Sequence, residues 1–143
     1  MKLTSIFEEG DVIPSRYTCD GKDMSPPLSI SDVPDDTQSL VLIVDDPDVP
    51  SGAWVHWVVV DISPGVREIA ENTSPGVDLT NSFKRTKYGG PCPPSGVHRY
   101  FFKLYALDKK LTLSSTSTKT DVEVAMQGHI MAQAGLMGRY QRS

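Results

Sequence analysis

The sequence predicts a mainly β protein with one C-terminal helix. Eleven Gly and eleven Pro residues are spread along 143 residues and separate short apolar runs, a pattern typical of strands joined by turns. The strongest runs are rich in β-branched residues, which favours strands. A stretch near the C-terminus carries helix signals instead. The length fits a single domain that covers residues 1–143.

Three segments are predicted strands. Residues 40–44 and 55–62 are β-branched runs with apolar side chains on both faces, as expected for strands inside a two-layer core. Residues 97–107 also carry apolar side chains on both faces, and they place His98 and Tyr100 on the same face. These strands would form the centre of the protein.

Residues 63–94 form a long connection between the second and third predicted strands. This segment is rich in Gly, Pro, Ser, Thr and Asn and shows no sustained periodicity. A connection of this length is uncommon in a compact domain unless it is functional. We therefore expect it to form one wall of a pocket.

The predicted helix covers residues 121–134. Residues 120–123 match the Thr-x-x-Glu pattern of a capping box, and apolar residues at helical spacing follow. Gly128 inside this helix would cost about 1 kcal/mol relative to Ala, which suggests that another group packs closely against it. Gly135 and Gly138 would mark the end of the helix.

The composition argues against several classes of partner. Fourteen Lys and Arg against eighteen Asp and Glu leave a net charge of −4, without a basic block for nucleic acid. No apolar run approaches the roughly 18 residues of a membrane span, and the N-terminus becomes acidic before a signal-like apolar region develops. We expect a protein that is soluble and cytoplasmic. Only Cys19 and Cys92 occur; reduced thiols are the default expectation, and a bridge between them is an open alternative.

Carboxylates and histidines gather at two Pro-containing turns. A hairpin between the first two predicted strands would bring Asp46 and Asp48 close to His56. His98 joins them only if its strand runs antiparallel to the strand that ends before Asp46. A carboxylate beside a histidine favours the imidazolium, so His56 and His98 could donate N–H groups to an anion. Tyr100 could add a hydroxyl.

Other interpretations compete with an anion site. A histidine at a strand end is commonly structural, an Asp-Pro-Asp sequence is ordinary turn chemistry, and Trp57 suits the core. Two histidines and an aspartate match the composition of a metal triad, but their spacing carries no metal signature. No Gly-x-Ser-x-Gly, His-Glu-x-x-His, Walker or dinucleotide motif occurs. We therefore predict no catalytic residues, no metal and no cofactor.

The same residues resemble the phosphatidylethanolamine-binding protein family, which includes the Raf kinase inhibitor proteins, in its bacterial and archaeal branch. The resemblance is specific and covers nearly the whole chain. The matching blocks are residues 46–50 with 54–57, 90–94 with 98–100, 17–21 with 25–28, 126–130, and 138–142.

This resemblance implies a two-sheet antiparallel β-sandwich-like fold with peripheral helices. It also implies a small pocket for phosphate-like anions or phospholipid head groups. The pocket residues carried over from the family are Asp46, Asp48, His56 and His98, with Trp54, Pro94 and Tyr100 around them. A cis peptide bond is expected in the first block, for which Val49–Pro50 is the candidate.

Three functions follow as hypotheses. The first is a non-enzymatic binding module, with a regulatory role, whose pocket accepts phosphate or a phosphorylated small ligand. The second, implied by the resemblance, is inhibition of a serine protease through a surface loop; kinases are a further partner class of the family, although the C-terminal region follows the microbial pattern. The third is an enzyme that uses His56 or His98 as a general base.

Overall fold

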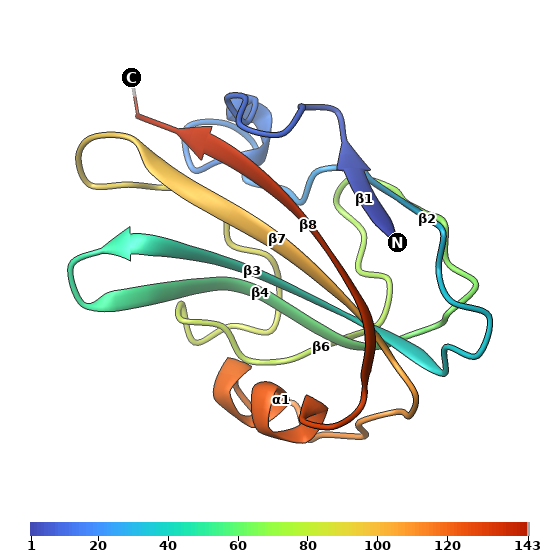
Figure 1. Cartoon of the computed structure of the whole chain (residues 1–143). Coiled ribbons are helices and arrows are strands. Elements are labelled where there is room, and N and C mark those ends of the chain that lie inside the picture. Colours follow the sequence, from blue (N-terminus) through green and yellow to red (C-terminus); the bar gives the residue numbers. More distant parts are fainter. Residues whose placement is uncertain (143) are drawn as a thin grey trace.

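The computed structural model describes residues 1–142, which form two antiparallel sheets (Figure 1). The small sheet has the order β1-β2-β5, with β1 at Lys2–Ser5, β2 at Leu28–Ser31 and β5 at Glu68–Ile69. The large sheet has the order β6-β4-β3-β7-β8, with β6 at Val77–Asp78, β4 at Gly52–Ile62, β3 at Ser39–Val49, β7 at His98–Leu107 and β8 at Ile130–Tyr140. The helices are a 3-10 turn at Ser15–Tyr17 and α1 at Lys119–Met126. The predicted two-sheet β fold with peripheral helices is confirmed.

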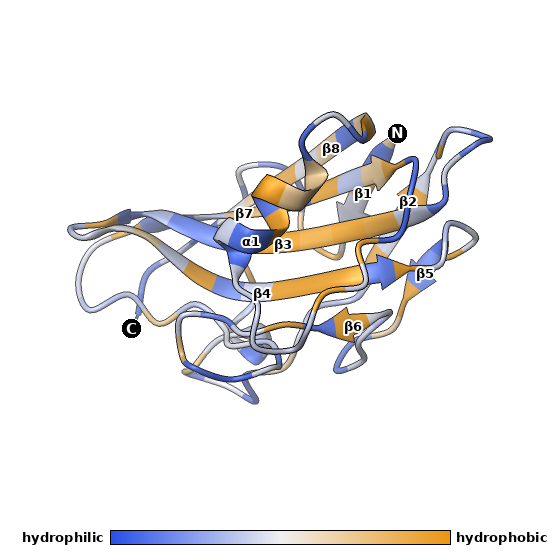
Figure 2. Ribbon diagram, turned by 90° about the horizontal axis from the view of Figure 1, so that it is seen from below, coloured by the Kyte–Doolittle hydropathy of each residue, from blue (hydrophilic) through white to orange (hydrophobic). Residues whose placement is uncertain are grey.

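Two apolar cores explain why the central strands are apolar on both faces. Leu42 of β3 and Phe102 of β7 pack toward the small sheet, whereas Ile43 of β3 packs toward Val122 and Met126 of α1. In Figure 1 the β1–β2 pair and α1 lie on opposite sides of the large sheet, and Figure 2 shows the apolar length of β3 and β4 passing behind α1. A strand with a core on each side must bury both of its faces.

The three predicted strands are present at the expected places. Residues 40–44 lie in β3 and residues 55–62 lie in β4. The predicted strand at residues 97–107 starts one residue before β7 and ends with it. β3 pairs antiparallel with both β4 and β7. The antiparallel pairing that His98 needs in order to join Asp46 and His56 is therefore confirmed.

The predicted helix at residues 121–134 is only partly right. α1 ends at Met126, and Ile130–Tyr140 is the strand β8, paired along its length with β7. Gly128 lies beyond the helix at φ +79°, where an added Cβ would meet nothing within 4 Å. Its role is thus the left-handed turn that ends the helix, and the expected close packing is wrong. The expectation that Gly135 and Gly138 end the helix is wrong too, because both lie in β8.

The helix cap is shifted by two residues from the prediction at residues 120–123. Thr118 is the N-cap, and its backbone N–H donates to Asp121 Oδ2 at 2.9 Å. Asp121 therefore takes the place that Glu123 was expected to hold. Its carboxylate also lies in the first turn, where the helix dipole favours negative charge.

Gly138 in β8 provides a stringent test of the packing between the N-terminal segment and the large sheet. A Cβ at Gly138 would lie 2.5 Å from Ile13 Cγ1 and 2.7 Å from Phe7 Cε2. We expect Gly138→Ala to lower the free energy of unfolding by about 1–3 kcal/mol, because both contacts are buried and must move. Urea denaturation measures this loss.

Gly135→Ala is the matched control on the same strand. A Cβ at Gly135 would lie 3.7 Å from the carbonyl oxygen of Phe102, an ordinary contact. We expect this variant to be within about 0.5 kcal/mol of the parent. Equal losses in the two variants would show that a general strand effect, not the packing of Ile13 and Phe7, sets the stability.

Two further features concern expectations about the chain. The Val49–Pro50 peptide bond is trans, so the expectation of a cis bond is wrong. Among the described residues, no helix combines the length and apolar character that a membrane crossing requires.

Candidate functional site

A cavity of about 330 Å³ opens at the end of the large sheet where β3 finishes and β4 and β7 begin. Five of the seven predicted site residues line it: Asp46, Trp54, His56, Pro94 and Tyr100. The other lining residues are Val49, Phe83, Cys92 and Pro93. The predicted residues Asp48 and His98 lie at the same end of the sheet but do not line the cavity.

Asp46 forms the acidic floor of the cavity. Its side chain is 3% exposed, and Oδ2 lies 2.6 Å from His98 Nδ1. Because a carboxylate only accepts hydrogen bonds, Nδ1 of His98 must carry the proton. Oδ1 of Asp46 accepts the backbone N–H of Asp48 at 2.7 Å. His98 therefore holds the carboxylate in place from behind the cavity.

His56 is held by a backbone carbonyl rather than by a carboxylate. It is 3% exposed, and its Nδ1 lies 2.7 Å from the carbonyl oxygen of Gly89, so Nδ1–H is the donor. Nε2 is therefore the ring nitrogen of His56 that is left to contact a ligand in the cavity. Burial lowers the pKa of His56, although the Gly89 hydrogen bond and the charge of Asp46 act in the opposite direction. In the neutral form Nε2 is an acceptor, and it becomes a donor only on protonation.

The lowered pKa of His56 has a consequence for stability. The unfolded chain takes up a proton near the ordinary pKa of 6.5, above the pKa of the folded form. The unfolded state thus binds more protons in this range, so we expect the free energy of unfolding to fall as the pH drops below 6.5. Urea denaturation at pH 7.5 and 5.5 measures this fall, and NMR titration follows the protonation of the His56 ring directly.

His56→Gln is the control for this pH effect. It removes the titrating ring, so we expect the loss between pH 7.5 and 5.5 to shrink while the contributions of other groups remain. An His56 signal that titrates above 6.5 would contradict the assignment.

Aromatic rings surround the polar floor. Phe83 makes edge contacts with Trp54 and His56, at centroid distances of 5.5 and 5.4 Å, and Tyr100 contacts His56 at 5.2 Å. Burial and then the negative charge of Asp46 raise the pKa of Tyr100, so its hydroxyl keeps its proton. The cavity therefore combines an apolar rim with a carboxylate, an imidazole and a phenol.

Phe83 belongs to the residue 63–94 connection and was not singled out from the sequence. The backbone N–H of Phe83 donates to Asn81 Oδ1 at 3.0 Å, and Asn81 Nδ2 donates to the carbonyl of His56 at 3.0 Å. Phe83 and Tyr88 are the only aromatic residues in this connection, which is the signal that could have identified them. With Cys92, Pro93 and Pro94, Phe83 makes the connection a wall of the cavity, as expected.

Asp48 is engaged by Arg99 instead of facing the cavity. Arg99 Nη2 lies 2.8 Å from Oδ1 and Nε lies 3.0 Å from Oδ2, and the backbone N–H of Arg99 donates to Oδ2 at 2.9 Å. The side-chain hydrogen bond with Arg99 lowers the pKa of Asp48 to about 2. This pair joins the start of β7 to the end of β3, next to the cavity.

Cys19 and Cys92 form a disulfide, which corrects the default expectation of reduced thiols. The backbone N–H of Cys19 also donates to the carbonyl of Pro91 at 3.1 Å. Because Cys92 lines the cavity, the bond ties the cavity wall to the loop that carries Cys19. Two cysteines 73 residues apart give no local sequence signal for such a bond.

Within residues 1–142, no three side chains of His, Cys, Asp or Glu converge in a way that could hold a metal ion. The polar groups of the cavity are instead held by hydrogen bonds to one another and to the backbone.

Comparisons with known proteins agree on one family. The family model for the phosphatidylethanolamine-binding protein matches residues 4–141. The "UPF0098 protein" of Methanothermobacter thermautotrophicus is 49% identical over 146 residues, with 97% of each chain covered. That of Aquifex aeolicus is 48% identical, over 95% of this chain and 85% of the relative.

Solved structures give the same result. The crystal structure of a putative phosphatidylethanolamine-binding protein homolog from Chlamydia trachomatis matches with a TM-score of 0.96 at 46% identity, covering 99% of this chain and 97% of that chain. Escherichia coli YbcL, described as a new member of the mammalian PEBP family, matches with a TM-score of 0.90 at 28% identity, covering 99% of this chain and 98% of that chain.

Proposed function

Because this chain belongs to the phosphatidylethanolamine-binding protein family, we propose that its cavity at Asp46 and His56 binds a small phosphorylated anion. Membership of the family supports a ligand-binding protein in general. The ligand class proposed for this chain is a phosphate monoester or a phospholipid head group. The observation that carries the proposal is His56, whose bond to Gly89 leaves Nε2 as its one free polar atom inside an apolar rim.

The donors for the anion are Tyr100 and protonated His56. The hydroxyl of Tyr100 keeps its proton because burial raises its pKa. His56 Nε2 donates only when the ring is charged, and burial opposes that charge. An anion in contact with Nε2 stabilises the imidazolium, so binding takes up a proton and strengthens as the pH falls.

The negative charge of Asp46 on the cavity floor makes the pH dependence of anion binding stronger. A carboxylate at this position opposes a bare anion, and the anion gains a positively charged partner only when His56 is protonated. A head group with an ammonium group would gain a further contact, because Trp54 and Phe83 offer ring faces and edges at the rim and aromatic faces attract cations.

The site is proposed as a receptor and not as a catalyst. The sulfur of Cys92, which lines the cavity, is bonded to Cys19 and is not a free nucleophile. His56 donates its Nδ1 proton to a carbonyl, not to a carboxylate that would stabilise a positive charge during general-base catalysis. Pro93, Pro94 and the disulfide hold the wall in place, which lowers the ordering cost of binding.

NMR titration with phosphoethanolamine, inorganic phosphate and sulfate tests the proposal. Sulfate keeps its charge between pH 7.5 and 5.5, so any change in its affinity reports on the protein. We expect saturable shifts of the His56 ring and the Trp54 indole signals, with sulfate binding several-fold more tightly at pH 5.5. Unchanged signals of His56, His98 and Trp54 at millimolar ligand would overturn the proposal.

Two variants and one control sharpen this test. Tyr100→Phe removes one donor, and we expect a loss of affinity of about tenfold. His56→Gln is expected to abolish the pH dependence of sulfate binding. His129→Gln removes the exposed histidine that pairs with Asp108 far from the cavity, and it should leave binding unchanged. Equal effects of His56→Gln and His129→Gln would contradict a specific role for His56.

A further inference from the structure

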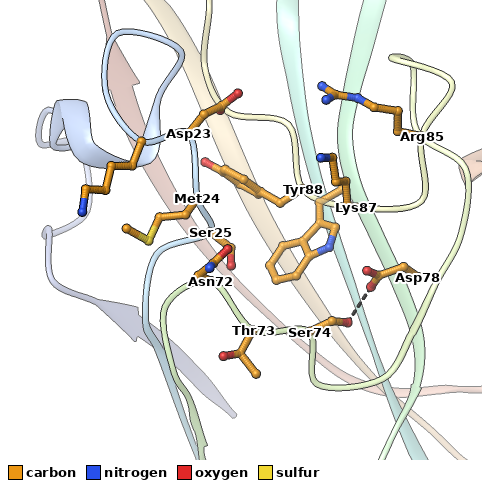
Figure 3. A pocket seen from close by; sticks show the side chains of 12 residues that line it. Asp23, Met24, Ser25, Asn72, Thr73, Ser74, Asp78, Arg85, Lys87 and Tyr88 are labelled. Carbon is orange, nitrogen blue, oxygen red and sulfur yellow. Dashed lines mark hydrogen bonds between the residues drawn. The ribbon is translucent and has the colours of Figure 1, made fainter.

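A second cavity, of about 490 Å³, lies beside Trp57 and shares no lining residue with the first. Its walls come from three loop segments, at residues 22–25, 72–74 and 85–88, and from Asp78 of β6, with Trp57 of β4 at its base. We infer that this cavity binds a phosphorylated polyol of the sugar-phosphate class. Figure 3 shows the loop side chains arranged around the opening.

Positive charge at the rim indicates an anionic group on the ligand. Lys22, Arg85 and Lys87 line the cavity, and none of them forms an ion pair within the part of the chain that the structure describes. Figure 3 shows the charged ends of Arg85 and Lys87 directed the same way, toward the side on which Tyr88 lies. Two neighbouring cations without acidic partners suit a phosphate group.

A buried donor at the base points to a ligand more directly. Trp57 is 2% exposed, and its indole Nε1 has no hydrogen-bond partner in residues 1–142. Burial raises the pKa of the nearby Asp78 carboxyl and interaction with the Trp57 indole acts in the opposite direction, but Asp78 and Nε1 do not reach hydrogen-bond geometry. Buried polar groups without partners are rare in folded proteins and mark places where a ligand or water completes the bonding.

The remaining polar groups indicate hydroxyl groups on the same ligand. Asp23 and Asp78 are acceptors. Oδ1 of Asp23 already accepts the backbone N–H of Gly90 at 2.7 Å and Oδ1 of Asp78 accepts the hydroxyl of Ser74 at 2.5 Å, so one oxygen of each carboxylate remains for a ligand. Ser25 and Asn72 add groups that both donate and accept. Inorganic phosphate alone would leave the remaining carboxylate oxygens and most of the cavity unused, whereas the hydroxyl groups of a sugar would donate to those oxygens.

The two tryptophans make the two cavities distinguishable. Trp54 lines the first cavity and Trp57 lines the second, and the sequence holds no other tryptophan. Each indole N–H gives one NMR signal, assigned through Trp54→Phe and Trp57→Phe. Titration with glucose 6-phosphate is expected to shift the Trp57 signal in a saturable way, independently of whether phosphoethanolamine shifts that of Trp54.

Charge variants test the role of the rim. We expect the double variant Arg85→Gln, Lys87→Gln to weaken glucose 6-phosphate binding by about tenfold or more, and both residues are exposed, so the fold should be retained. Lys110→Gln, an exposed lysine away from the cavity, is the matched control. Uncharged glucose should bind about tenfold more weakly than its phosphate.

Several outcomes would overturn the inference. A Trp57 signal that glucose 6-phosphate, glucose and phosphate all leave unmoved at about 20 mM would show that the cavity binds none of them. Equal affinity of the double variant and the parent would remove the rim cations from the site. Equal affinity for glucose and glucose 6-phosphate would identify a neutral sugar site in its place.

Discussion

Breaking the bond between Cys19 and Cys92 is expected to lower the free energy of unfolding by about 4 kcal/mol. The bond closes a loop of 73 residues, so it removes many conformations from the unfolded chain. The chain-entropy relation for a loop of this length gives that value. Urea denaturation of Cys19→Ser, of Cys92→Ser and of the double variant measures the loss.

The three variants serve as controls for one another. Each single substitution already breaks the bond, so we expect the double variant to lose no more than either single one. Dithiothreitol should destabilise the parent by the same amount and leave the double variant unchanged. A parent protein whose unfolding midpoint does not respond to dithiothreitol would contradict the disulfide.

The disulfide also bears on the binding site and on the compartment. Cys92 lines the first cavity, so its release is expected to loosen the wall and weaken sulfate binding along with stability. Cytosolic proteins of mesophiles usually keep their thiols reduced, which runs counter to the expectation of a cytoplasmic protein. The compartment therefore stays a prediction, and the redox state of Cys92 in the cell is its direct test.

The central strands could be predicted because their sequence signal is local. Residues 40–44 are apolar at every position, and a strand between two cores requires this. Ile130–Tyr140 could not be predicted in the same way, since its Ala and Met residues also suit a helix. Its strand conformation depends on pairing with β7, for example between Ala134 and Leu104, and a contact between residues so far apart in the sequence leaves no local signal.

Part of the site was also predictable, for a topological reason. A hairpin brings Asp46 and His56 together whatever the details of its turn, and the antiparallel pairing of β3 with β7 adds His98. The ionisation of His56 was not predictable, because it depends on burial and on the carbonyl of Gly89. The second cavity was missed because three irregular loops enclose it.

Asp46 is the charged residue at which we expect a single substitution to lower the stability most. Asp46→Ala leaves the Nδ1–H of His98 and the backbone N–H of Asp48 without their acceptor, and the side chains of Asp46 and His98 are only 3% and 10% exposed. We expect a loss of about 3–5 kcal/mol in the free energy of unfolding, as for other broken buried pairs. Asp48→Asn is the matched control, because its partner Arg99 is half-exposed and such a pair contributes at most about 1 kcal/mol.

Asp46→Asn separates the charge of Asp46 from its place in the structure. The amide keeps one acceptor, so it should cost less stability than Asp46→Ala. The negative charge of Asp46 raises the pKa of His56 against the larger effect of burial, and its removal should therefore shift the NMR titration of His56 to lower pH. The pH at which sulfate binding strengthens should then move down with the His56 titration, while the loss of the opposing carboxylate charge should favour sulfate once His56 is protonated. If the pKa of His56 does not change in Asp46→Asn while the free energy of unfolding falls, Asp46 acts on the fold alone. That result would contradict the proposed electrostatic link between Asp46, the protonation of His56 and anion binding.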